Sequence, residues 1–300
     1  MSSGTTLVLG GSGFLGAHVV AQAGSEVVVA GREEGPEKAL RAGSPRAKFR
    51  KLDALAPGQL ELVLDSVRPA KVILCTALSS VADAEKYPGL ARALNVEFPR
   101  LVAVWCARSR ARLVHVSTDL VFGGNDPPPG GFCEEDPPAP LSEYGRSKSA
   151  GESAVLQAHP KALVVRLPLL YGDSFGRDRG ASDSLLSAIA RGERPTLFTD
   201  EWRTPLDVAN AARALVELAE TDASGLLHVA GPDRVSRYEL GLLVLRSREM
   251  DDAAARAAIR PATRAEAGLE ATRARDASLD SRRSRSLLST PLLCLQDTPG

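Results

Sequence analysis

Short apolar runs alternate with helical patterns along the first half of the chain. The helical patterns lie at about 14–23 and 91–108, and the apolar runs predict strands at Thr6–Leu9, Glu26–Ala30, Lys71–Cys75, Arg112–Ser117 and Ala162–Arg166. These runs are apolar throughout, as in strands that helices cover on both faces. The pattern therefore predicts an α/β fold with a Rossmann-type, doubly wound parallel sheet.

The rhythm changes after Pro168. Helical segments dominate there (182–191, 208–220 and 238–245), with one clear strand at Leu226–Val229. We expect residues 1–168 to form the Rossmann domain, with 205–222 returning to it, and residues 169–300 to form a smaller, mostly helical domain. The stretch from Met250 to Arg285 has little apolar periodicity, so we expect exposed helix and loop.

Composition and charge narrow the function classes. The 300 residues carry 37 basic and 37 acidic side chains, so the formal net charge is zero. A neutral chain lacks the electrostatics of a general nucleic-acid binder, and no uncharged apolar run is long enough to cross a bilayer. The N-terminus shows no basic region or cleavage signal, so we expect a cytoplasmic protein. The four cysteines form no Cys-x-x-Cys pair, and neither a metal site nor a disulfide framework is predicted.

A glycine motif follows the first predicted strand and opens the first predicted helix. Gly10, Gly13 and Gly16 fit G-x-x-G-x-x-G, in which small residues let the backbone approach a pyrophosphate at a helix N-terminus. The alternative is a glycine-rich turn without a ligand. Arg32 ends the second strand, where an arginine suits the 2′-phosphate of NADP(H) better than the free ribose of NAD(H), which stays open. Asp53 lies near the adenine or is simply solvated.

The pair Tyr144 and Lys148 carries the candidate chemistry. Residues at i and i+4 lie on one face of a helix. A phenol is a poor acid or base at neutral pH, and a nearby ammonium lowers its pKa by stabilising the phenolate. Thr118 ends a predicted strand, and its hydroxyl can hold a substrate carbonyl oxygen. The alternatives are an amphipathic tyrosine at a helix start and a solvated lysine.

Together these residues identify a family. The glycine motif, Asn95, Ser117-Thr118 and Tyr144-x-x-x-Lys148 resemble an extended short-chain dehydrogenase/reductase. The stretches 117–123 and 135–152 are similar to its dTDP-4-dehydrorhamnose reductase branch, and the resemblance extends from about residue 5 to about residue 245. It implies that residues 1–168 bind NADP(H), that residues 169–300 bind substrate, and that the protein reduces a 4-keto sugar linked to a nucleotide.

The resemblance also implies residue roles. Tyr144 would donate the proton, Lys148 would lower its pKa and bind the nicotinamide ribose, Thr118 would hold the carbonyl, and Asn95 would help to position Lys148. The cofactor set is Gly10, Gly13, Phe14, Leu15, Gly16, Arg32, Asp53, Cys75, Thr76, Ala77, Tyr144, Lys148 and Leu167. The substrate set is Ser79, Val81, Thr118, Asp119 and Arg203, with Arg203 as a partner for a substrate phosphate.

Departures from the branch keep other functions open. Leu120 and Leu169 stand where the branch usually has aromatic residues, and Ala82 replaces an acidic residue. The form around Leu169 is closer to the regulatory β subunit of methionine adenosyltransferase, which would make the chain an NADP-binding regulatory subunit. A sugar-nucleotide epimerase is a further alternative, whereas a dehydratase is disfavoured because Leu120 follows Asp119 in place of a glutamate. A homodimer also stays open.

Overall fold

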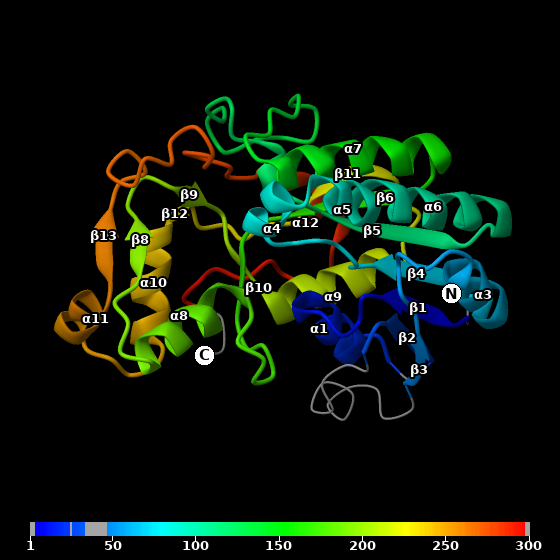
Figure 1. The fold of residues 1–300 in the computed structure, drawn as a ribbon, viewed down its shortest axis with the longest axis horizontal. Helices are drawn as coiled ribbons and strands as arrows, with labels where there is room; N and C mark the ends of the chain where they lie inside the picture. Colours follow the sequence, from blue (N-terminus) through cyan, green and yellow to red (C-terminus); the bar gives the residue numbers. More distant parts are fainter. Residues whose placement is uncertain (1–3, 25, 34–46, 298–300) are drawn as a thin grey trace.

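The computed structural model describes residues 4–24, 26–33 and 47–297. Its centre is a seven-stranded sheet in the order β11-β6-β5-β4-β1-β2-β3 (Figure 1). Every neighbouring pair in it is parallel. The strands are β1 (Thr6–Leu9), β2 (Val27–Gly31), β3 (Lys48–Lys51), β4 (Lys71–Leu74), β5 (Arg112–Thr118), β6 (Leu163–Leu167) and β11 (Gly225–His228). The predicted doubly wound parallel sheet is confirmed.

Helices cover both faces of this sheet because successive strand residues point to opposite sides. Val8 packs on one face with α1 (Phe14–Gln22) and α9 (Val208–Leu218). Its neighbours Leu7 and Leu9 pack on the other face, in the cluster to which the second group of helices contributes. That group is α3 (Gln59–Val67), α6 (Phe98–Ser109) and α7 (Glu143–Ala158).

The direction of strand order reverses between β1 and β4. Strands β2 and β3 follow on one side of β1, and β4, β5 and β6 follow on the other. In sheets of this kind, ligands bind in the crevice outside the carboxyl ends of the strands at this reversal. The fold therefore places the functional crevice at the residues after β1, β4 and β5.

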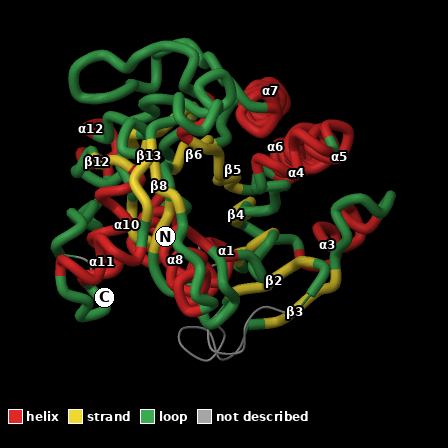
Figure 2. Tube along the Cα trace, turned by 60° about the vertical axis from the view of Figure 1, so that its left-hand side comes forward, coloured by secondary structure: helices red, strands yellow, loops and turns green. Residues whose placement is uncertain are grey.

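A second group of elements lies beside the carboxyl edge of the sheet (Figures 1 and 2). Three helices, α8 (Gly180–Ala190), α10 (Arg237–Arg246) and α11 (Asp252–Ala258), contribute to a separate apolar cluster. Three strand pairs accompany them: parallel β7 (Leu170–Tyr171) with β10 (Leu206–Asp207), parallel β8 (Thr196–Phe198) with β13 (Arg260–Ala262), and antiparallel β9 (Trp202–Arg203) with β12 (Val235–Ser236). The remaining elements are the short helices α4 (Val81–Lys86), α5 (Pro88–Arg92) and α12 (Arg282–Leu287), a π-helical turn at Ala93–Glu97 and a 3-10 turn at Asp119–Val121.

Two expectations for the second half of the chain need correction. The strand expected at Leu226–Val229 within the smaller domain is β11, which pairs with β6 at the edge of the main sheet. The stretch expected to be exposed between Met250 and Arg285 instead buries Ala274, Ala277 and Leu279 against Phe122 and Phe132. Both depend on partners more than 60 positions away along the chain, which local periodicity does not report.

Candidate active site

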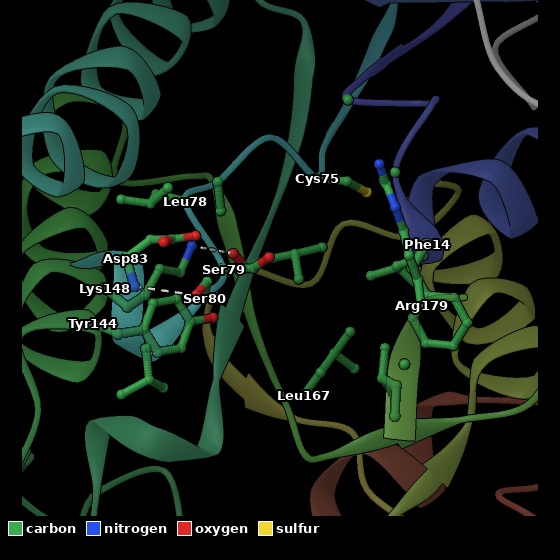
Figure 3. A pocket seen from close by; sticks show the side chains of 18 of the residues that line it. Phe14, Cys75, Leu78, Ser79, Ser80, Asp83, Tyr144, Lys148, Leu167 and Arg179 are labelled. Atoms are coloured by element: carbon green, nitrogen blue, oxygen red, sulfur yellow. Dashed lines mark hydrogen bonds between the residues drawn. The ribbon is translucent and has the colours of Figure 1, made fainter. Parts of the chain in front are cut away.

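A cavity of about 1320 Å³ runs across the carboxyl edge of the sheet. Figure 3 shows Tyr144 and Lys148 on one side of it, with Phe14 and Arg179 opposite. Every residue of the predicted cofactor set lines this cavity, and so do Ser79, Val81, Asp119 and Arg203 of the predicted substrate set. Thr118 and Asn95 lie behind the wall, where they are buried.

The glycine loop after β1 has no room for side chains. Gly10 has a left-handed φ of 82°, and a Cβ atom on it would lie 2.7 Å from the backbone nitrogen of Thr76. A Cβ atom on Gly16 would lie 2.1 Å from the carbonyl oxygen of Gly10. Helix α1 begins after Gly13 without a side-chain cap, so its first backbone N–H groups can meet an anion. This cradle fits a dinucleotide diphosphate.

The residues after β2 and β3 lie at the other end of the same cavity. Arg32 is exposed there, directly after the last residue of β2. The Asp53 carboxylate accepts the backbone N–H of Leu55 at 3.0 Å, so it closes a local turn as well as lining the cavity. Arg32 therefore lies where residues of this fold contact the ribose of a bound dinucleotide. Asp53 stabilises a local turn through its bond to Leu55.

Tyr144 and Lys148 lie in the first two turns of α7. The hydroxyl of Ser142 caps this helix by accepting the N–H of Gly145 at 3.1 Å. Gly145 lets the helix approach the end of β5, because a Cβ atom there would lie 2.2 Å from the carbonyl oxygen of Leu120. Lys148 is only 1% exposed, and its Nζ donates to the carbonyl oxygen of Val116 at 2.7 Å.

Burial shifts the pKa values of Tyr144 and Lys148 in opposite directions. Burial lowers the pKa of Lys148 to about 8, and the carboxylate of Glu152 opposes the shift. Burial raises the pKa of Tyr144 to about 12, a hydrogen bond with Thr118 opposes the shift, and Asp119 adds to it. The resemblance implies a lowered tyrosine pKa, but burial dominates here. A phenol that keeps its proton is suited to act as an acid.

Asn95 connects the end of β4 to α7. It is fully buried in a π-helical turn, Ala93–Glu97, between α5 and α6. Its side chain accepts the N–H of Leu78 at 2.9 Å and donates to the hydroxyl of Ser147 at 3.0 Å. Asn95 therefore bonds to the neighbour of Lys148, and the interruption of the helix fits the frequent use of π turns at functional sites.

Thr118 is turned toward its neighbours in the chain. Its hydroxyl donates to the carboxylate of Asp119 at 3.1 Å and accepts the N–H of Leu120 at 3.2 Å. The carboxylate of Asp119 also lies 3.3 Å from the guanidinium of Arg203. Burial raises the pKa of Asp119 to about 6, although Arg203 and the Thr118 hydroxyl oppose the shift. A line of polar contacts thus joins the β5 end to the second group of elements.

Three arginines and two carboxylates form the charged wall of the cavity, which consists of Asp119, Glu201, Arg203, Arg237 and Arg273. Glu201 pairs with Arg203 at 3.3 Å and with Arg273 at 2.7 Å. The Nη1 atom of Arg237 is buried without a hydrogen-bond partner in the described part of the chain, and burial lowers the pKa of this group to about 10. The wall keeps one positive charge in excess, which suits a phosphate.

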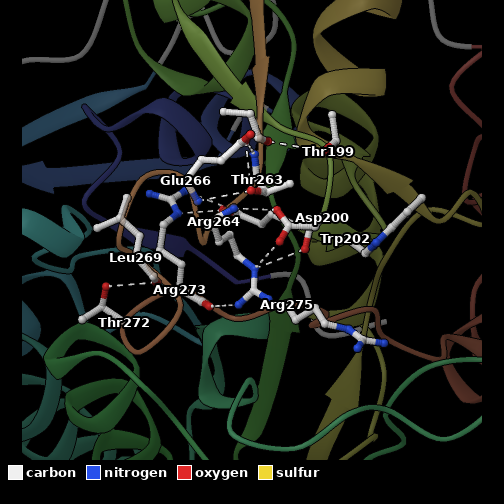
Figure 4. A network of polar contacts seen from close by, with 12 residues as sticks. Thr199, Asp200, Trp202, Thr263, Arg264, Glu266, Leu269, Thr272, Arg273 and Arg275 are labelled. Atoms are coloured by element: carbon white, nitrogen blue, oxygen red, sulfur yellow. Dashed lines mark hydrogen bonds and ion pairs between the residues drawn. The ribbon is translucent and has the colours of Figure 1, made fainter.

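Sequence reasoning identified Arg203 but missed Arg237 and Arg273. No local motif marks either residue, since Arg237 opens α10 and Arg273 lies in the loop after β13. Figure 4 shows the contacts that hold this loop. The side chain of Arg264 donates to the carbonyl oxygen of Arg273 at 2.8 Å, and the backbone N–H of Arg264 donates to the carboxylate of Asp200 at 2.9 Å. Arg264 itself does not line the cavity. Long-range polar contacts therefore place Arg273.

Metal-ligating side chains and the thiol of Cys75 were also located relative to the cavity. Within residues 4–24, 26–33 and 47–297, no three His, Cys, Asp or Glu side chains are grouped in a way that could hold a metal ion. Cys75 lines the cavity, but burial raises its pKa to about 12, so its thiol stays protonated at neutral pH.

In the same described ranges, no helix is both long and apolar enough to span a membrane.

Several known proteins are similar to this chain in sequence. A probable low-salt glycan biosynthesis reductase of Haloferax volcanii is 37% identical over 60% of this chain and 60% of its own length. The chain thus spans less than two thirds of that relative. A dTDP-4-dehydrorhamnose reductase of Mycobacterium tuberculosis is 36% identical over 77% of this chain and 71% of its own length.

A solved structure matches nearly the whole chain. The dTDP-4-dehydrorhamnose reductase of Bacillus anthracis in complex with NADP is 25% identical, with a TM-score of 0.79, and the match covers 98% of this chain and 96% of that chain. Subunit beta of methionine adenosyltransferase 2 from Pongo abelii is also similar, at 31% identity over 66% of this chain and 60% of its own length. The model of the RmlD substrate binding domain matches residues 4–296. The chain therefore belongs to the RmlD substrate binding domain family.

Proposed function

We propose that this protein is an NADPH-dependent reductase of a nucleotide-linked 4-keto sugar. One observation carries the proposal: the glycine loop and the pair Tyr144–Lys148 line a single cavity. At about 1320 Å³, this cavity exceeds the roughly 300–1,000 Å³ of a typical single-ligand pocket, so a dinucleotide and a sugar nucleotide can share it. The names of the bacterial relatives support the same activity.

The residues of the chain divide the work of this reaction. The glycine loop and the N-terminus of α1 would hold the diphosphate of NADPH, and Arg32 would face its ribose phosphate. When bound, NADPH supplies a hydride to the ketone carbon. Tyr144, protonated at neutral pH, donates its proton to the ketone oxygen, and the ammonium of Lys148 stabilises the resulting phenolate. A rotation of the Thr118 hydroxyl would let it orient the ketone oxygen.

The charged wall supplies the site for the nucleotide diphosphate of the substrate. Arg237 has a buried guanidinium nitrogen without a hydrogen-bond partner in the part of the chain that the structure describes. A buried donor of this kind is costly unless a ligand pairs with it. Arg203 is already paired with Asp119 and Glu201, so it serves to position the wall rather than to bind phosphate alone.

Turnover of keto sugars tests the proposal. NADPH is mixed with a panel of dTDP-4-keto sugars, and the absorbance of reduced nicotinamide is followed. We expect consumption with at least one sugar, and Tyr144→Phe should abolish it while NADPH binding stays within a few-fold. Tyr87→Phe is the matched control, because Tyr87 is 47% exposed and lies outside the cavity lining. Retained turnover in Tyr144→Phe would refute the role of Tyr144 as proton donor.

A second candidate is an NADP-binding regulatory subunit. The observation that favours it is the similarity to subunit beta of methionine adenosyltransferase 2, together with Leu120 and Leu169 in the cavity wall. Such a protein would bind NADP without turnover and would copurify with a catalytic partner. An epimerase would instead change the sugar without net cofactor consumption. A homodimer remains part of the proposal, and analytical ultracentrifugation of the full chain tests it.

A further inference from the structure

The loop between β7 and α8 places an arginine against the glycine loop. The Nη1 atom of Arg177 donates a hydrogen bond to the carbonyl oxygen of Ser12. Its Nη2 atom lies 3.8 Å from the carboxylate of Glu33, which follows Arg32 directly after β2. A cation from the second group of elements, more than 140 positions along the chain, therefore reaches the end of the second strand of the sheet.

Several contacts hold this loop in place. The Nε2 atom of His18 on α1 lies 2.7 Å from the carbonyl oxygen of Asp173, and the ring of Phe175 stacks on the imidazole with centroids 4.4 Å apart. The hydroxyl of Ser174 accepts the N–H of Arg177 at 3.2 Å. Phe175 has a left-handed φ of 57°, which persists only where surrounding contacts enforce it. The position of Arg177 is thus set by the fold.

The groups around Arg177 match a phosphate monoester. The hydroxyl of Ser12 lies 3.3 Å from the point where a Cβ atom on Gly31 would be, which puts it at the end of β2 beside Arg32. Ser12, Arg32, Glu33 and Arg177 all line the main cavity. In this fold the residues after the second strand read the 2′ position of the adenosine ribose. Two guanidinium groups and a hydroxyl there are typical donors for a phosphate.

We propose that Arg177, together with Arg32 and Ser12, forms a clamp for the 2′-phosphate of NADP(H). The inference rests on the NADP binding of the proposed function and deepens it. Glu33 competes for Arg177, because its carboxylate would attract the guanidinium away from a phosphate and would repel that phosphate. Its side chain is 77% exposed, so it can turn into solvent. The clamp selects NADP(H) over NAD(H) with a residue of the second half of the chain.

Binding of two nucleotides to the full chain tests the clamp without any turnover. Calorimetry compares 2′,5′-ADP with 5′-ADP, which lacks the 2′-phosphate. Arg177→Gln should weaken 2′,5′-ADP about tenfold, as expected for loss of a charged hydrogen bond, and should change 5′-ADP by less than about twofold. Glu33→Gln should strengthen 2′,5′-ADP by about two- to fivefold, because the competing pair is exposed. The variants should change the binding of NADP relative to NAD in the same way.

Matched variants separate the clamp from general effects. Arg100→Gln removes a positive charge from an exposed pair with Glu97 outside the cavity lining, and it should change the binding of neither nucleotide. Arg177→Lys keeps the charge without the planar fork and should retain part of the preference. If thermal melting shows that Arg177→Gln is unfolded, Arg177→Lys and Glu33→Gln decide the question in its place.

Three results would overturn the clamp. They are equal losses of both nucleotides in Arg177→Gln, unchanged binding of 2′,5′-ADP in that folded variant, and a wild-type protein that binds both nucleotides equally. Failure of the reductase proposal looks different. A protein that prefers 2′,5′-ADP through Arg177 but oxidises no NADPH with any keto sugar keeps the clamp and loses the reductase activity.

Discussion

The Nζ atom of Lys148 donates a hydrogen bond of 2.7 Å to the carbonyl oxygen of Val116, two residues before the end of β5. This bond fixes α7 on the strand that leads to Thr118. A buried ammonium with a backbone partner keeps a defined position, but burial makes its charge costly. The burial of Lys148 therefore goes together with both the fixed position of its ammonium and its lowered pKa.

The rate of reduction should fall as the pH rises through about 8. Burial lowers the pKa of Lys148 to about 8, so the ammonium is present below this pH and is lost above it. Without the ammonium, the phenolate left by proton donation is not stabilised. Measurements of kcat between pH 6 and 10 check this. Lys148→Met should lower kcat by roughly 100-fold and remove the alkaline limb, and an identical limb in that variant would exclude Lys148 as its source.

A second limb should lie at the acidic side, where the rate falls as the pH drops through about 6. Burial raises the pKa of Asp119 to about 6, so the carboxylate that pairs with Arg203 and accepts the Thr118 hydroxyl is lost below this pH. Asp119→Asn keeps the shape and an acceptor oxygen but does not titrate. Its profile of kcat/KM from pH 4.5 to 8 should be flat on the acidic side. An unchanged acidic limb would assign it to another group.

The pair Glu152–Arg166 should dominate the stability of the polar interior behind the site. Its side chains are 4% and 1% exposed, with Arg166 Nη2 2.8 Å from Glu152 Oε2, and Ser117 donates to the same carboxylate at 2.5 Å. Arg166→Met leaves a buried carboxylate without its cation, which should lower the free energy of unfolding by about 3–5 kcal/mol.

Urea denaturation at neutral pH measures this loss. The control is Arg146→Gln, which breaks the exposed pair between Arg146 and Glu143 on the same helix and should cost less than about 1 kcal/mol. Equal costs for the buried and the exposed pair would show that the Glu152–Arg166 contact does not stabilise the fold in the expected way.

Gly16→Ala should impair dinucleotide binding through the backbone of the glycine loop. The added methyl group would lie 2.1 Å from the carbonyl oxygen of Gly10, so the loop or α1 must move. We expect a loss of stability of about 1–3 kcal/mol and a loss of NADP affinity, measured by thermal melting and calorimetry. Gly89→Ala is the control, because a Cβ atom at Gly89 meets nothing within 4 Å. Wild-type NADP affinity in Gly16→Ala would contradict the close approach.

Local patterns predicted the parts of the site that lie within a few residues of one another. The loop from Gly10 to Gly16 depends on backbone conformation next to a strand, and the pair Tyr144–Lys148 depends on helical spacing. The apolar runs likewise predicted six of the seven strands of the main sheet, all except β3, but the prediction for one of the six, β11, wrongly placed it in the smaller domain. Each of these features depends on residues that are close together in the sequence.

The sequence by itself therefore determined the parallel sheet, the glycine loop and the spacing of the tyrosine and lysine, because short-range backbone geometry fixes each of them. Only the tertiary structure decided that β11 joins the main sheet, that burial sets the pKa values of Tyr144 and Lys148, and that Arg177 and Arg237 reach the cavity. Arginines recur throughout this chain, and no local motif marks Arg177 or Arg237. Long-range packing selects which of them meet a ligand.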